Sequence, residues 1–193
     1  ISVPMLWLTA HKSKEVVTVP ETQVKVSLKD RFRTLRCKPI LIIIAVFLFH
    51  GYVYYGRAAI YPYYFTYLCN KPAMLVEFGG IIGVANVIGT MISPYVHKFF
   101  THKGKATVAQ VLLFAVSTFA IYWFPPQENL LMFYLLTFLG GIGLGSYMVM
   151  LYSMVPDAID DSHNKSGVSA NGFLYACTSF MCKGGGALAP TIS

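Results

Sequence analysis

Charged residues are scarce in this sequence. Only 12% of its 193 residues are Asp, Glu, Lys or Arg, whereas about 25% is usual in a soluble domain. Its four cysteines form no CxxC pair and no zinc-finger spacing, so we expect free thiols. These shortages argue against a soluble enzyme and against a small secreted domain stapled by disulfides.

Hydrophobic residues, in contrast, make up 55% of the chain, and the mean hydropathy is +0.57. They fall in long runs separated by short polar stretches, as in helical membrane proteins that cross the bilayer several times. Lipid offers no hydrogen-bond partner to an unpaired backbone, so each run must be helical. The sequence predicts an all-α membrane protein with five membrane segments, at about 39–68, 73–96, 106–124, 130–155 and 170–193.

The polar stretches divide the chain further. We expect residues 1–10 to be the end of a transmembrane helix and residues 11–38 a central cytoplasmic loop, in which 27–33 could form a short helix along the membrane surface. Residues 39–193 then form a transmembrane bundle. Because the sequence starts at Ile1 inside an apolar stretch and stops inside another, we expect it to be a piece of a longer protein.

Positive charge is concentrated beside the apolar runs. Eight of the 15 Lys and Arg lie between Lys12 and Lys38, and three more lie between Lys98 and Lys105. Such a bias marks the cytoplasmic side of a membrane protein. The basic stretches contain no recognition motif with interleaved aromatics. The distribution of positive charge therefore indicates how the chain is oriented in the membrane, and we expect no nucleic-acid partner.

Polar residues recur at helical spacing within three of the predicted segments. These stripes are His50, Tyr54, Arg57, Tyr61 and Tyr64; Asn86, Thr90, Ser93 and His97; and Tyr175, Ser179, Lys183 and Gly186. Polar groups at membrane depth are costly and often functional, so the stripes predict a shared, water-accessible cavity. The alternative is hydrogen bonding between packed helices, which we favour for the Thr and Ser positions.

The two cations of these stripes need a counter-charge. A buried Arg57 or Lys183 requires an acid or carbonyl partner, yet the eight Asp and Glu of the chain all lie in predicted loops or at segment ends. We therefore expect the partner acids in the rest of the protein.

The stretch from Pro156 to Gly167 is predicted to be a cytoplasmic loop that contains three Asp and one His. We favour the interpretation that these acids pair with a nearby Lys or cap the next helix. A metal site or a membrane metalloenzyme is a remote alternative. The chain shows no Ser/His/Asp or Cys/His nucleophile set. We expect neither enzymatic activity nor a bound metal.

Glycines punctuate two of the predicted helices. Gly141 and Gly145 form a small-xxx-small pair, which permits close helix approach. The surrounding glycine run is no dinucleotide fingerprint, because no strand precedes it. Glycines at 184–186 are expected to loosen the last helix.

Several motifs together resemble one transporter family. They are Ser153-Met154-Val155-Pro156-Asp157-Ala158-Ile159-Asp160 with Lys165-Ser166-Gly167, Val26-Ser27-Leu28-Lys29-Asp30, Arg57 with Tyr63-Tyr64-Phe65-Thr66-Tyr67, and Cys182-Lys183-Gly184-Gly185-Gly186. In this order they resemble the glycoside–pentoside–hexuronide (melibiose permease-like) cation symporters of the major facilitator superfamily. The resemblance implies a partial bundle: the end of helix six, then helices seven to eleven of a twelve-helix transporter.

The resemblance also implies roles for individual residues. Lys183 matches a lysine near the cation site, and Ser179 matches a hydroxyl beside the sugar. The candidates for substrate or cation binding are Lys183, Ser179, Arg57, Tyr61 and Tyr64, and a cytoplasmic gating loop would contain Asp157, Asp160 and Lys165. A coupling cation, Na⁺ or H⁺, is implied, and no other cofactor.

The expected function is cation-coupled symport of a sugar or glycoside by alternating access, in the plasma membrane, with the lipid bilayer and a missing amino-terminal half as partners. Two alternatives stay open. One is a transporter of the same fold with a lipid-like substrate. The other is a truncated half-transporter that carries nothing.

Overall fold

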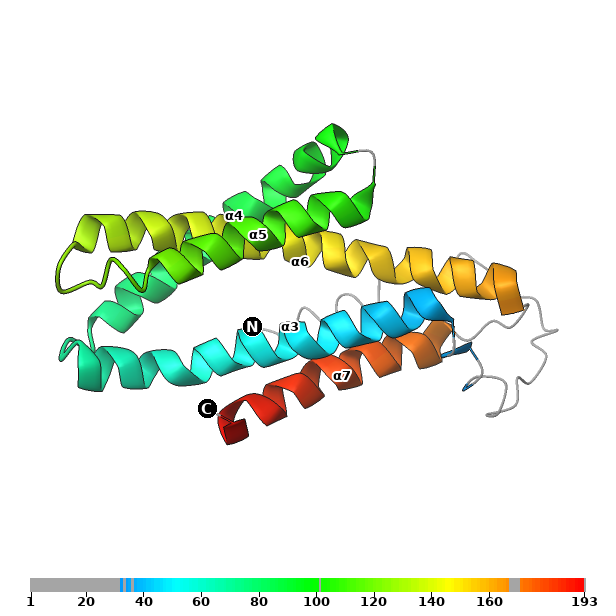
Figure 1. Cartoon of the computed structure of the whole chain (residues 1–193), viewed down its shortest axis with the longest axis horizontal. Coiled ribbons are helices and arrows are strands. Elements are labelled where there is room, and N and C mark those ends of the chain that lie inside the picture. Colours follow the sequence, from blue (N-terminus) through cyan, green and yellow to red (C-terminus); the bar gives the residue numbers. More distant parts are fainter. Residues whose placement is uncertain (1–31, 33, 36, 101, 167–170, 193) are drawn as a thin grey trace, which may run out of the picture.

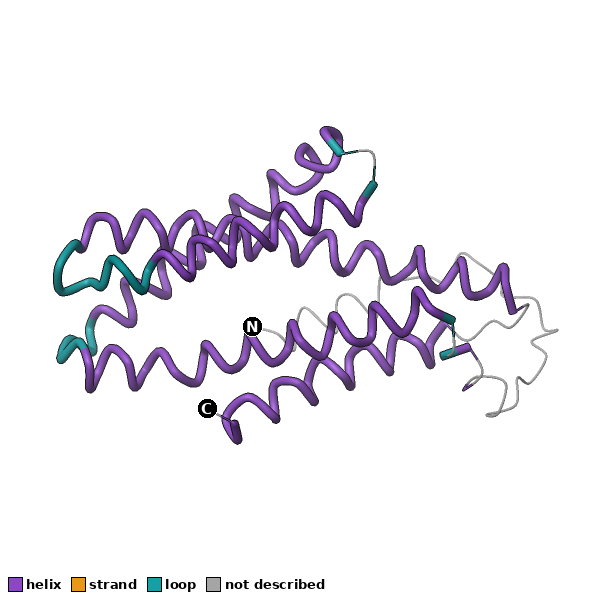
Figure 2. Tube along the Cα trace, in the orientation of Figure 1, coloured by secondary structure: helices purple, strands orange, loops and turns teal. Residues whose placement is uncertain are grey.

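The computed structural model describes residues 32, 34–35, 37–100, 102–166 and 171–192, and these are almost entirely helical (Figure 2). The long helices are α3 (Lys38–Tyr63), α4 (Met74–Phe99), α5 (Lys103–Ala120), α6 (Leu130–Ser166) and α7 (Asn171–Ile192). A π-helical turn, η1 (Tyr64–Leu68), continues α3. The predictions for residues 1–31, including most of the surface helix at 27–33, lie outside the described residues.

Three helical stretches are long and apolar enough to cross a membrane: Lys38–Leu68, Met74–Phe99 and Leu130–Lys165. Their outward faces carry many large apolar side chains, among them Phe49, Val76 and Phe99 at 68%, 79% and 87% exposure. A soluble monomer rarely exposes so much apolar surface, whereas a bilayer covers it. The chain is an all-α membrane protein, and the spanning roles of α5 and α7 stay predictions.

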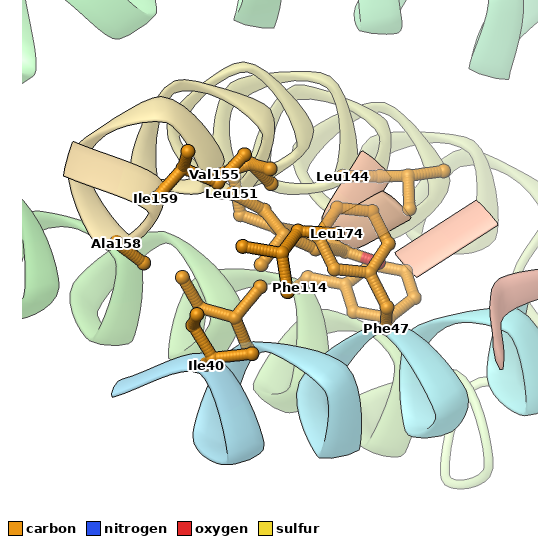
Figure 3. Packing of buried hydrophobic residues seen from close by; sticks show 11 residues of the cluster. Ile40, Phe47, Phe114, Leu144, Leu151, Val155, Ala158, Ile159 and Leu174 are labelled. Atoms are coloured by element: carbon orange, nitrogen blue, oxygen red, sulfur yellow. The ribbon is translucent and has the colours of Figure 1, made fainter. Parts of the chain in front are cut away.

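The helices are arranged in two layers. Helices α3 and α7 run side by side in one layer, and α4 and α5 both pack on α6 in the other (Figure 1). Contacts between α3 and α6 are fewer, and those between α6 and α7 fewer still. The largest apolar core joins the layers at one end, where Ile40 and Phe47 of α3 meet Leu151 and Ile159 of α6 (Figure 3).

Close contacts through glycine hold each layer together. In the first layer, a Cβ added at Gly51 would collide with the carbonyl of Cys182, and one added at Gly185 with that of Leu48. In the second layer, a Cβ on Gly141 would stand 2.6 Å from that of Ala85. Helices in lipid gain little from hydrophobic burial and depend on such close packing. The predicted close approach at Gly141 is confirmed.

The glycines of α7 differ from the expectation. They do not interrupt the last helix, which runs without a break from Asn171 to Ile192. Gly185 lies against the backbone of α3, and Gly186 faces the ring of Tyr55. Glycine is needed at these two positions for its small size rather than for its conformational freedom, because a side chain at either position would separate α7 from α3.

The segment after Pro156 also differs from the expectation. The predicted loop at 156–167 is helical as far as Ser166, so α6 is a single helix of 37 residues. Along this extension Val155, Ala158, Ile159 and Ser162 are buried, a spacing of three, one and three that defines one helix face. The polar residues between them masked this periodicity in the sequence.

Candidate functional site

A cavity of about 230 Å³ lies between the two layers. Its lining is Tyr54, Arg57, Ala58 and Tyr61 from α3; Leu75, Phe78, Gly79 and Ile82 from α4; Phe114 from α5; and Leu144 from α6. All the polar side chains of this lining come from α3, and the three helices of the other layer contribute only apolar groups. The lining is therefore mostly apolar, and its few polar groups all come from α3.

Arg57 is held in this cavity by two aromatic residues. Its Nε donates a hydrogen bond of 2.7 Å to the hydroxyl of Tyr61, one helical turn away, and Nη2 donates to the same oxygen. The guanidinium carbon lies 4.6 Å from the centre of the Phe114 ring of α5, within cation–π range. Among the described residues Arg57 forms no ion pair.

The predicted stripe on α3 is divided by the structure. Tyr54, Arg57 and Tyr61 share the cavity face, as their spacing of three and four predicts. His50 is buried away from that lining, and its Nδ1 and the hydroxyl of Tyr147 on α6 are hydrogen-bonded at 2.7 Å. Tyr64 lies in η1, half-buried and outside the lining.

Tyr147→Phe is expected to destabilise the contact between the layers. The substitution removes the partner of a buried His50 nitrogen, which costs about 1–3 kcal/mol, or a fall of roughly 2–12 °C in the apparent Tm. Thermal unfolding in detergent measures it. Tyr152→Phe is the matched control, since Tyr152 is half-exposed on the same helix and makes a ring contact with Phe47 that the substitution keeps. Equal shifts in the two variants would contradict the role of the hydrogen bond.

The stripe on α4 does not line the cavity. Ser93 is fully buried and donates a hydrogen bond of 2.9 Å to the carbonyl of Ser146 on α6. Thr90 donates to the carbonyl of Asn86 in its own helix. The α4 residues that do line the cavity lie earlier in the helix, between Leu75 and Ile82. The interpretation as hydrogen bonding between packed helices therefore holds for Ser93, whereas Thr90 bonds within its own helix.

Lys183 and Ser179 lie on α7, apart from the cavity. Both are exposed, and neither belongs to the lining. Helix α7 turns Cys182 and Gly185 toward α3, so Lys183 lies on a face that the described residues leave uncovered. The structure thus brings Arg57 and Tyr61 together and leaves Lys183 and Ser179 outside that group.

The residues predicted to gate the cytoplasmic side lie on the helical extension of α6. Asp157 accepts a hydrogen bond of 2.5 Å from Lys103 at the start of α5. Lys165 pairs with Asp161 one turn earlier, at 2.6 Å. Asp160 is exposed, and the described residues provide no ion pair for it. Within the described part of the chain, no group of three or more His, Cys, Asp or Glu is arranged to hold a metal ion.

The ion pair between Lys103 and Asp157 is expected to contribute little to stability. Both side chains are substantially exposed, and solvated pairs are worth about 0.2–1 kcal/mol. A double-mutant cycle with Lys103→Gln and Asp157→Asn, followed by thermal unfolding, measures the coupling. Coupling well above 1 kcal/mol would contradict this estimate and would indicate that the pair is shielded in the complete protein.

Sequence reasoning missed the apolar wall of the cavity. In the sequence, the apolar residues Phe114, Phe78 and Leu144 are indistinguishable from lipid-facing or core residues, because only polar groups stand out at membrane depth. Only the position of Phe114 beneath the Arg57 guanidinium gives it a distinct role. No periodicity within one helix could predict that contact, since it joins α3 to α5.

Comparison with known proteins identifies the class. The chain matches the family described as MFS/sugar transport protein over residues 1–193. It belongs to that family, whose members are transporters of the major facilitator superfamily, and it is an integral membrane protein with several spans. The predicted fold class, a partial bundle of this superfamily, is confirmed. No solved structure matches the chain.

Individual relatives are distant. The chain is 25% identical to an uncharacterized symporter of Bacillus subtilis (strain 168) over 91% of its own length and 38% of the relative. It is 27% identical to a putative sulfoquinovose importer of Escherichia coli (strain K12), over 96% and 39%. A sodium-dependent lysophosphatidylcholine symporter of Xenopus tropicalis is 26% identical, over 64% and 23%. The chain spans less than two fifths of the length of the bacterial relatives.

Proposed function

We propose that the protein is a cation-coupled symporter that carries a sugar or glycoside by alternating access. The observation that carries the proposal is the family match along the whole chain. Similar proteins named as symporters support the coupling, and one named as an importer of sulfoquinovose supports a sugar-like solute. Two helix bundles would rock about a site near the membrane midplane.

In this proposal the described helices are one bundle, and an amino-terminal half supplies the other. Lys183 would lie near the cation site, and its exposed face on α7 would meet acids of that half, since an uncompensated cation at membrane depth is costly. Ser179, Tyr61 and Tyr64 would contact the sugar, and Asp157, Asp160 and Lys165 would take part in cytoplasmic gating. The coupling cation would be Na⁺ or H⁺, and the site of action the plasma membrane.

Uptake by vesicles that contain the full-length protein tests the proposal. Labelled hexoses and glycosides are offered with an inward Na⁺ gradient, with an inward proton gradient, or with neither. We expect one gradient to drive accumulation above equilibrium, and an ionophore for that cation to abolish it. If every gradient leaves uptake at the level of empty vesicles, the symporter proposal fails and the protein is a half-transporter or carries another solute.

A lipid-like solute is the second candidate. It is favoured by the relative named as a lysophosphatidylcholine symporter and by a cavity whose α4, α5 and α6 walls are apolar. Competition separates the candidates, because an excess of lysophospholipid below its micelle concentration would inhibit transport of a lipid-like solute and leave sugar transport unchanged.

A further inference from the structure

The cavity between the layers contains a cation whose hydrogen-bonding capacity is largely unused. A guanidinium has five N–H donors, and within the described chain Arg57 directs its recorded hydrogen bonds only at the hydroxyl of Tyr61, from Nε and Nη2. Nη1 therefore has no hydrogen bond to a described residue. Arginine in this state is suited to a planar or tetrahedral anion, which accepts two parallel hydrogen bonds from its fork.

The surroundings of Arg57 fix its position. Tyr61 binds the guanidinium from one side, and the ring of Phe114 lies beneath its carbon at 4.6 Å. The side chain is thus directed toward α5, inside the described bundle. Preorganisation of this kind lowers the entropy cost of binding, since the fork need not be ordered by the ligand.

No acid of the described chain neutralises this cation. Asp157 pairs with Lys103 and Asp161 with Lys165, and Glu77 accepts a hydrogen bond from Tyr134. The charge of Arg57 remains uncompensated within a cavity whose other walls are apolar, such as Leu75, Ile82 and Leu144. In such surroundings a counter-ion gains more than it would in water.

We propose that this cavity is a subsite for the negatively charged group of an amphipathic solute, a sulfonate, phosphate or carboxylate, with Arg57 as its counter-charge. The apolar wall from α4, α5 and α6 takes the uncharged body of the solute beside that group. The volume, about 230 Å³, is below the roughly 300–1,000 Å³ of drug-sized pockets, so it accommodates a single sugar-sized unit or the end of a longer molecule. This assignment rests on the proposed transport function and defines its substrate class.

Two matched pairs of probes test the assignment on the purified full-length protein. One pair is glucose and its 6-deoxy-6-sulfonate, and the other is a monoacylglycerol and the lysophosphatidate of the same chain length. We expect the anionic member of at least one pair to bind more than tenfold more tightly than the neutral member. An advantage in the sugar pair alone identifies a soluble sugar acid, and an advantage in the lipid pair alone identifies a lipid headgroup.

Variants assign the effect to the cavity. Arg57→Gln is expected to remove the anion advantage, at least about tenfold in affinity, and Arg57→Lys to restore part of it, because it keeps the charge and loses the fork. Lys71→Gln is the matched control, since it removes the same charge from an exposed position just after η1. Tyr61→Phe, which keeps the ring, is expected to reduce the advantage without abolishing it.

Two results overturn the assignment. One is the lack of an anion advantage in both pairs, whether through equal binding or no binding. The other is an advantage that Arg57→Gln leaves intact, which would place the counter-charge elsewhere in the protein. Cation-driven uptake of a neutral hexose would then still support the proposed function. Conversely, anion binding that depends on Arg57, without any gradient-driven uptake, would sustain the subsite and refute the symporter.

Discussion

Gly185→Ala is expected to separate α7 from α3 and to cost about 3 kcal/mol, the upper part of the usual range for overpacking. The added Cβ would overlap the carbonyl oxygen of Leu48 and stand 2.8 Å from the backbone nitrogen of Tyr52. Both neighbours are backbone atoms, which cannot move aside as a flexible side chain does. We expect a fall of roughly 6–12 °C in the apparent Tm, measured by thermal unfolding in detergent.

Gly184→Ala is the matched control for this experiment. Gly184 precedes Gly185 in the same helix, and a Cβ added there meets no atom within 4 Å. Alanine is the better helix former by about 0.8–1.0 kcal/mol, so this variant should be as stable as the wild type or slightly more so. Equal melting temperatures for the two variants would show that α3 and α7 do not pack through Gly185.

In the proposed symporter, Lys183→Gln is expected to lower the stimulation of transport by the coupling cation at least about tenfold, while correctly folded protein is still present in the membrane. The side chain is exposed on α7 and has no ion pair with a described residue. A lysine on such a face at membrane depth requires an acid or carbonyl partner. Uptake at increasing cation concentration, with and without the substitution, measures the effect.

A control variant separates the specific role of Lys183 from the general effect of losing one positive charge. Lys98→Gln removes one positive charge near the end of α4, where Lys98 lies 5.4 Å from the ring of Tyr95, and should leave the cation dependence unchanged. Unaltered cation stimulation in Lys183→Gln would show that Lys183 is not part of the coupling site. Arg57 would then be the remaining candidate cation.

Much of the helical layout follows from hydropathy alone. The predicted segment at 39–68 agrees with α3 and η1 together, from Lys38 to Leu68, because apolar runs and a proline at the helix start are local signals. The extension of α6 to Ser166 was missed, since polar residues at 157–166 conceal a buried face. That face is buried in a cluster with residues from the starts of α3 and α7, and such tertiary contacts are not visible in the sequence.

Only the α3 side of the candidate site was predictable from the sequence. Helical spacing placed Arg57 and Tyr61 on one face of α3, and the structure shows them joined. The same reasoning grouped Lys183 with them, although α7 lies on the other side of α3 from the cavity lining. A stripe defines the face of a helix but not the neighbour that this face meets, and that neighbour depends on how five helices are layered.

The pairing of α3 with α7 also has a consequence for biosynthesis. The two helices are neighbours in space but lie far apart in the sequence. Helix α3 is Lys38–Tyr63, near the start of the described chain, and α7 is Asn171–Ile192, at its end. At ribosomal rates of about 5–20 residues per second, several seconds pass after α3 emerges before α7 is made. During that interval the surface of α3 at Gly51 and Gly56 lacks its partner helix. We expect lipid or other helices to cover this part of α3 until the last helix arrives.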